Sequence, residues 1–174
     1  MATTNPMQQV RIEKVTLNIG CGKDQTKLEK GMTLIKQLAG IPPVKTVTQK
    51  RIPTWGLRPG LPVGCKLTLR KQAAAVLLKR LLVARDNNLP NGCFDENGNI
   101  SFGIPEYIDV EGAAYDPKIG VMGLQASVTL EKPCHRIKRR KLRKAKIPSR
   151  HGVSKQEAID FMKAAFSTKI EGMA

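Results

Sequence analysis

The sequence predicts an α+β domain: an antiparallel sheet with helices packed on one face, a long basic loop within a hairpin and a basic C-terminal extension. Three segments alternate apolar and polar residues with the period of a half-buried strand. Three others carry apolar residues at helical spacing, and the strand connections are short enough for hairpins. The 174 residues suit a single domain over 1–174, with a basic extension at 132–151 that leads into a C-terminal helix.

The first part of the chain predicts a strand, a helix and a second strand. Apolar and polar residues alternate over 15–19, which is typical of a strand with one buried face. A helix follows: Thr26 and Glu29 have the spacing of a capping box, and Gly40 stands where the helix should end. Its apolar stripe consists of Leu28, Met32, Ile35 and Ala39. The segment "PPVKTVTQ" then predicts a short strand after a proline turn.

The middle of the chain repeats this pattern. "VGCKLTLR" alternates cleanly and is the clearest strand in the sequence. A second helix is predicted from the stripe Ala74, Leu77, Leu78 and Leu81, and "DNNLPNG" breaks it.

The last part predicts two more strands and a helix. "ENGNISFGI" indicates a turn that enters a short strand, and "MGLQASVTL" alternates like the earlier strands. In the final helix Ser154 and Glu157 make a capping box, ahead of the apolar stripe Ala158, Phe161, Met162 and Ala165.

The charge distribution indicates a polyanionic partner. The formal net charge is +16, and ten of the nineteen residues from Lys132 to Arg150 are Lys or Arg, with no acidic residue among them. Without this run the chain still carries a net charge of +6. Nucleic acid is favoured over a membrane because no segment has a strong basic amphipathic pattern or ~18 consecutive apolar residues. The start "MATTNPMQQV" has no signal-peptide pattern, so a cytoplasmic location is expected.

The residues that could carry metal or enzyme chemistry form no convincing site. The cysteines are scattered, and Cys134, His135 and His151 would need a fourth ligand to hold zinc. Asp95 opens a segment that matches part of a calcium loop, but Ile100 replaces the required glycine. No hydrolase, deaminase or nucleotide-binding motif is present. We therefore expect no metal, no cofactor and no enzymatic activity.

The polar faces of the predicted strands suit a phosphate and sugar surface. They carry small hydrogen-bonding or basic groups and no carboxylate: Lys14, Thr16, Asn18, Lys66, Thr68, Arg70, Gln125, Ser127 and Thr129. Single-strand RNA platforms stack bases on aromatic side chains, and none falls on these faces. Recognition of backbone shape and 2′-hydroxyl groups is therefore favoured. The alternative is an ordinary solvated sheet face.

The segment 50–60 is long for a hairpin connection and contains the only tryptophan, Trp55. Long ordered loops are often functional. Alternatively, Trp55 folds back to shield a sheet edge; the residues alone leave both interpretations open.

Four segments, "RIEKVTLNIGCG", "LPVGCKLTLR", "FDENGNISFGI" and "YDPKIGVMGLQASVTLEKP", closely resemble the large-subunit ribosomal protein family L5, which binds 5S rRNA. The arginine-rich run followed by "HGVSKQEAIDFM" is similar to the archaeal form. The resemblance covers nearly the whole chain in the right order. It departs from the family at Ile41, where Gln is common, and at Trp55, where Phe is usual.

The resemblance implies a ribosomal protein of the central protuberance. Its partners would be 5S rRNA, large-subunit rRNA, P-site tRNA, other central-protuberance proteins and a protein of the small-subunit head. The sheet contacts to 5S rRNA would be Lys14, Thr16, Asn18, Lys66, Thr68 and Arg70. The loop contacts to tRNA would be Lys50, Arg51, Thr54, Trp55, Gly56 and Arg58. Other rRNA contacts would be Arg136, Lys138, Arg139, Arg140, Lys141, Arg143, Lys144 and Lys146.

Two other functions stay open from the residues themselves. A free-standing DNA or chromatin binder would share the positive charge, and an RNA-modifying enzyme would need a deep pocket with converging titratable groups.

We also expect the order of residues 138–146 to depend on bound RNA.

Overall fold

The computed structural model describes residues 5–171, so the first four and last three residues of the domain predicted over 1–174 lie outside the described part. Its main feature is one five-stranded antiparallel sheet with the strand order β2-β3-β1-β6-β5. The strands are β1 (Arg11–Gly20), β2 (Val44–Val47), β3 (Pro62–Leu69), β5 (Asn99–Ile104) and β6 (Leu124–Glu131). The predicted α+β class and the antiparallel sheet are confirmed.

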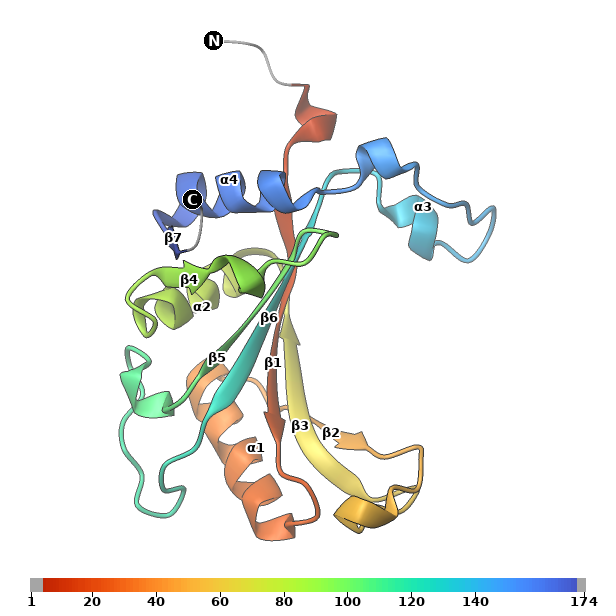
Figure 1. The fold of residues 1–174 in the computed structure, drawn as a ribbon. Helices are drawn as coiled ribbons and strands as arrows, with labels where there is room; N and C mark the ends of the chain where they lie inside the picture. Colours follow the sequence, from red (N-terminus) through yellow and green to blue (C-terminus); the bar gives the residue numbers. More distant parts are fainter. Residues whose placement is uncertain (1–4, 172–174) are drawn as a thin grey trace.

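Helices α1 (Gln25–Ala39) and α2 (Lys71–Val83) cover one face of this sheet, and the other face is left open (Figure 1). The alternating apolar residues of β1, β3, β5 and β6 all point toward the covered face and are buried there. Burial of this apolar surface is the main contribution to stability. The polar residues of the same strands therefore line the open face.

Two of the predicted helix ends are confirmed, and one is wrong. The left-handed backbone of Gly40 (φ 70°) ends α1, and Ser154 caps α4 (Lys155–Phe166) through the predicted capping box with Glu157. The capping box predicted at Thr26 is wrong, because α1 begins one residue before it and Asp24 is the N-cap. On α4, Ala165 is exposed, and Ile159 is buried instead.

Two short strands, one after α2 and one after α4, pair with each other and were not predicted. β4 (Asn88–Pro90) pairs in parallel with β7 (Lys169–Glu171), directly after α4. β4 lies inside the segment interpreted as a helix-breaking turn. The pairing holds α4 across the end of the sheet at which β1 begins (Figure 1).

The basic segments lie at opposite ends of the sheet. The extension, with its short helix α3 (Arg136–Arg139), follows β6 at one end, and the loop between β2 and β3 projects from the other (Figure 1). The open face of the sheet lies between them. No described helix is both long and apolar enough to cross a bilayer.

Candidate nucleic-acid interface

Side chains on the open sheet face form rows that cross the strands. In one row, hydroxyl groups face each other on neighbouring strands: Thr68 is opposite Thr16, which is opposite Ser127, which is opposite Ser101. The Oγ1 atoms of Thr16 and Thr68 lie 3.4 Å apart, and Ser101 donates to Ser127 at 3.2 Å. Each hydroxyl has further hydrogen-bonding capacity after these contacts. The row therefore presents a band of donors and acceptors to solvent.

The next row contains an amide pair and a basic group. Lys66 is opposite Asn18, and Asn18 is opposite Gln125. Asn18 Nδ2 donates to Gln125 Oε1 at 3.3 Å, which fixes the orientation of both amides. Lys66 is exposed beside them. On β5 the row ends at Gly103, which leaves open space above the backbone.

Strand β5 thus widens the polar face by residues that the sequence prediction did not include. Ser101 and Gly103 are exposed, whereas Ile100, Phe102 and Ile104 are buried. The alternation in "NISFGI" was the signal that could have added them.

One end of the open face carries a carboxylate, contrary to the expectation that it has none. A β-bulge between Ile12 and Lys14 places an extra residue, Glu13, in β1. Its carboxylate lies 3.1 Å from Arg70 Nη1 and 3.9 Å from Lys14 Nζ. Arg70 and Lys14 are therefore partly neutralised within the chain. The sequence alternation could not show this because the bulge shifts the phase of the strand.

The extension is anchored at its base. Lys132, its first residue, is buried, and its Nζ donates to Gly152 O at 3.0 Å and to Glu157 Oε1 at 2.8 Å. The rings of His135 and His151 stack with centroids 5.8 Å apart. Each imidazole is hydrogen-bonded to a main-chain carbonyl, His135 to Lys132 and His151 to Pro133. These contacts close the extension into a loop whose two ends meet.

A second set of contacts fastens the extension to the sheet. Arg139 Nη2 lies 2.8 Å from Glu13 Oε2 and 2.9 Å from Glu131 Oε2. Glu131 also pairs with Arg11 at 3.0 Å. Both carboxylates are largely buried, with 8% and 11% of their side chains exposed, so they require a cationic partner. Arg139, predicted as an rRNA contact, is thus engaged within the protein.

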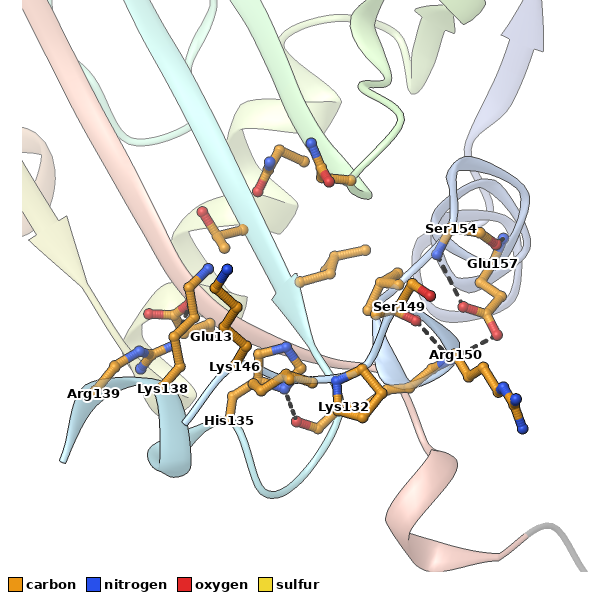
Figure 2. Close-up of a pocket in the computed structure, with 18 of the residues that line it drawn as sticks. Glu13, Lys132, His135, Lys138, Arg139, Lys146, Ser149, Arg150, Ser154 and Glu157 are labelled. Atoms are coloured by element: carbon orange, nitrogen blue, oxygen red, sulfur yellow. Dashed lines mark hydrogen bonds and ion pairs between the residues drawn. The ribbon is translucent and has the colours of Figure 1, made fainter. Parts of the chain in front are cut away.

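A groove of about 1660 Å³ lies between the extension and the open face. Its lining includes Lys14 and Thr129 from the sheet and Lys138, Lys144 and Lys146 from the extension. In Figure 2 the side chains of Lys138 and Lys146 both point from the extension toward the strands, whereas Arg150 points away. The groove therefore presents several ammonium groups next to polar sheet residues. Such a surface suits a phosphate backbone.

The loop between β2 and β3 is ordered by its own backbone. Thr48 exchanges hydrogen bonds with Leu61 and Gly60, and Ile52 pairs with Leu57. Leu57 is buried, and a left-handed Gly56 (φ 66°) ends the turn at Pro53–Trp55. Trp55 itself is 67% exposed, so it does not fold back to shield the sheet.

Three of the candidate metal ligands, His135, His151 and Asp95, make hydrogen bonds within the protein. Within residues 5–171 no three His, Cys, Asp or Glu side chains gather in a way that could hold an ion. The carboxylate of Asp95 accepts hydrogen bonds from Asn99, from the backbone of Glu96 and from Asn97, which lower its pKa. These bonds build the turn before β5.

Comparison with known proteins identifies the family. The model described as "Ribosomal protein L5" matches residues 5–58, and a second model, which describes the C-terminus of the same ribosomal family, matches residues 62–149. The chain belongs to the ribosomal protein L5 family. This family is a structural, non-catalytic component of the ribosome, so the chain is a ribosomal protein and not an enzyme.

Its similarity to archaeal members of the L5 family extends over almost the whole chain. It is 45% identical to "Large ribosomal subunit protein uL5" of Sulfolobus acidocaldarius, over 95% of this chain and 93% of the relative. With the protein of the same name from Nanoarchaeum equitans it shares 46% identity over 95% of this chain and 98% of the relative. The predicted archaeal type is confirmed.

The structure places the predicted L5 contact residues in three separate groups. The sheet group lies on adjacent positions of β1 and β3 or just beyond β3, so the fold brings it together. The loop group, Lys50, Arg51, Thr54, Trp55, Gly56 and Arg58, is exposed at one end. The extension group is exposed at the other end, and only Lys138, Arg139, Lys144 and Lys146 of it line the groove. Glu13 and Glu131, which the sequence patterns did not single out, hold Arg139 of this group.

Proposed function

We propose that the chain is a constituent of the large ribosomal subunit whose open sheet face binds 5S rRNA. The observation that carries this proposal is the pair of polar rows on the open face, which include Thr16, Asn18, Lys66 and Thr68. Hydroxyl and amide groups with a nearby lysine suit contacts to phosphates and 2′-hydroxyl groups. The rows contain no aromatic side chain on which a base could stack.

The loop at 50–60 is the proposed contact to P-site tRNA. It carries Lys50, Arg51 and Arg58 around an exposed Trp55 and lies away from the extension. Charge would attract the tRNA backbone, and the indole would add apolar contact without reading sequence. By family, the further proposed partners are other central-protuberance proteins and a protein of the small-subunit head, and the proposed location is the cytoplasmic ribosome.

Direct binding tests this proposal. The purified chain should retain 5S rRNA, and duplex DNA of equal length should compete poorly at the same salt concentration. Salt must be matched because the electrostatic contribution to affinity falls steeply with it. Equal affinity for the two nucleic acids would favour a general DNA or chromatin binder instead. Co-purification of 5S rRNA with the chain from cells provides a second, independent test.

A further inference from the structure

Two of the lysines that line the groove, Lys138 and Lys146, have no partner within residues 5–171. Neither Lys138 nor Lys146 makes an ion pair or a side-chain hydrogen bond with any other described residue. Both side chains nevertheless point into the same groove, toward the sheet (Figure 2). Like charges that face a shared space repel each other. An anion in the groove would relieve this repulsion.

The fold brings these two lysines together from different parts of the extension. Lys138 lies on α3, and Lys146 lies on the segment that returns from it. The backbone N–H of Ala145, next to Lys146, bonds to the carbonyl of Ile137, next to Lys138, at 3.4 Å. This hydrogen bond joins the two segments at residues that are next to the lysines in the sequence, so it holds the two lysines near each other.

Arg139 sets the position of this assembly relative to the sheet. It follows Lys138 on α3, and its guanidinium joins the carboxylates of Glu13 on β1 and Glu131 on β6. Because both carboxylates are mostly buried, the ion pairs fix α3 better than fully exposed ones would. The sequence alone led us to expect that residues 138–146 need RNA for their order, whereas these ion pairs favour a groove that is formed before RNA binds.

The opposite wall of the groove continues the polar face of the sheet. It is made by Lys14 on β1, Thr129 on β6 and Asn99 on β5. An RNA backbone that lies along the polar rows can therefore extend into the groove without leaving the protein surface.

We propose that this groove is a preformed site for an RNA phosphodiester strand, that Lys138 and Lys146 bind its phosphates, and that Arg139 is a positioning residue for them. The inference builds on the proposed function, because it takes the ligand to be ribosomal RNA. Neighbouring basic residues, which cannot be told apart by charge alone, thus have different roles: the two lysines bind phosphate and Arg139 positions them. The strand belongs either to 5S rRNA or to large-subunit rRNA.

Two double variants with equal charge change test the contact residues. K138Q/K146Q removes the two groove lysines that are proposed to bind phosphate, and K141Q/R143Q removes two exposed charges of the same extension that do not line the groove. Affinity is measured against salt for 5S rRNA and, separately, for large-subunit rRNA. With one of the two RNAs, the groove variant should flatten the plot of log affinity against log salt by roughly 0.7 to 0.9 per lost phosphate contact. The control variant should change the slope less. Equal slopes for the two variants with both RNAs would overturn the proposal.

A variant of Glu13 tests the role of Arg139, because the two interpretations of Glu13 predict opposite changes in RNA affinity. E13Q removes a negative charge near the groove, so simple electrostatics predicts tighter RNA binding. If Glu13 instead holds Arg139 and the extension, E13Q should weaken binding severalfold and speed amide hydrogen exchange over residues 136–146 in the free protein. E96Q is the matched control: Glu96 also lines the groove and has no ion pair within the described chain, so its loss should tighten binding.

Direct replacement of Arg139 completes the test. R139Q should speed hydrogen exchange in the same segment, and R139K should restore part of the protection. Unchanged exchange in both R139Q and E13Q would make Arg139 an ordinary surface charge. Wild-type protein that binds neither RNA would defeat the proposed function, whereas normal wild-type binding with indifferent groove variants would defeat only this inference.

Discussion

Asn18 on β1 donates a hydrogen bond from its side-chain nitrogen to the side-chain oxygen of Gln125 on β6, at 3.3 Å. This contact leaves the carbonyl oxygen of Asn18 and the amide nitrogen of Gln125 available to bind other groups. Both residues lie on the open face of the sheet, next to the row of hydroxyls. The pair therefore presents an acceptor and a donor in a fixed arrangement.

Asn18→Ala should weaken 5S rRNA binding by about 1 to 3 kcal/mol, because an RNA group desolvated at the interface would lose its partner. The free energy of unfolding should change by less than about 0.5 kcal/mol, since the side chain is not in the core. Affinity is measured by fluorescence anisotropy and stability by urea unfolding. Gln156→Ala on α4 is the matched control, because it removes a similar exposed hydrogen bond, to Asp160, away from the sheet face. Unaltered RNA affinity in folded Asn18→Ala would refute the assignment of this residue.

Trp55→Ala, or a shorter loop in place of residues 50–60, should leave folding, 5S rRNA binding and entry into the subunit intact. Retention of P-site tRNA on assembled ribosomes should fall, because an exposed aromatic contact is lost. Val76→Ala, which trims an exposed apolar side chain on α2, should leave tRNA retention unchanged. Loss of 5S rRNA binding in a folded loop variant would instead place the loop on that RNA.

Glu157 should make stability depend on acidic pH. Burial alone would raise the pKa of its carboxyl, but the hydrogen bond from Lys132, the backbone N–H of Ser154 and the charge of Lys132 outweigh it and hold the pKa below 4.5. A carboxyl with a lowered folded-state pKa stabilises the protein above its unfolded pKa, and this contribution is lost as pH falls through the folded pKa.

Glu157→Gln should therefore lower the free energy of unfolding by about 1 to 2 kcal/mol near pH 7, mainly because the ammonium of Lys132 is left without its counter-charge. The difference from wild type should shrink as pH falls below 4.5. Urea unfolding at several pH values measures both effects. Glu29→Gln, at an exposed position on α1, should show neither. A pH-independent difference would mean that the charge of Glu157 is not what matters.

Gly98→Ala should destabilise the turn that enters β5. Gly98 has a φ of +71°, and a Cβ there would lie 2.7 Å from Cγ1 of Val153. Strain and overlap together should cost about 1 to 3 kcal/mol. Gly103→Ala is the control, since nothing lies within 4 Å of the position of its Cβ. Equal stability of the two variants in thermal unfolding would contradict the packing of this turn against Val153.

Thiol reactivity should separate the four cysteines. Burial raises the pKa of Cys65 to about 11 and also raises the pKa of Cys21, whereas Cys134 is exposed. Since the thiolate is the reactive form, Cys134 should react fastest with a thiol reagent near pH 8. Cys134→Ser should remove the fast phase, and the remaining thiols should react rapidly only after denaturation. Persistence of a fast phase in this variant would point to an exposed Cys21, Cys65 or Cys93.

Local patterns were sufficient where one face of an element is buried. The alternation in β1, β3 and β6 gave both the strands and the side that faces the helices, because a strand alternates its side chains with a period of two. The same phase selected Thr16, Asn18 and Thr68 as neighbours on one surface. The capping box at Ser154 was also readable, since it is a contact between residues three apart.

Prediction failed where distant segments had to meet. Strands β4 and β7 are three residues each and stabilise one another across about 80 residues of chain, so neither has a recognisable pattern by itself. The bulge at Glu13 shifted the strand phase, and its partners Arg70 and Arg139 come from other parts of the chain.

The amino-acid sequence alone was enough to predict a basic α+β domain of the L5 family with a polar, non-aromatic sheet face. The charge, the fold class and the polar sheet face follow from composition, periodicity and short motifs, which are local, and the family follows from the resemblance of whole segments to known L5 proteins. The packing of distant segments sets which basic residues are available to RNA: Arg139 is held by Glu13 and Glu131, whereas Lys138 and Lys146 line a groove without a partner in the described part of the chain. The reason is physical, because the state of a charge depends on its burial and its nearest counter-charge, and both are set by the packing of distant segments.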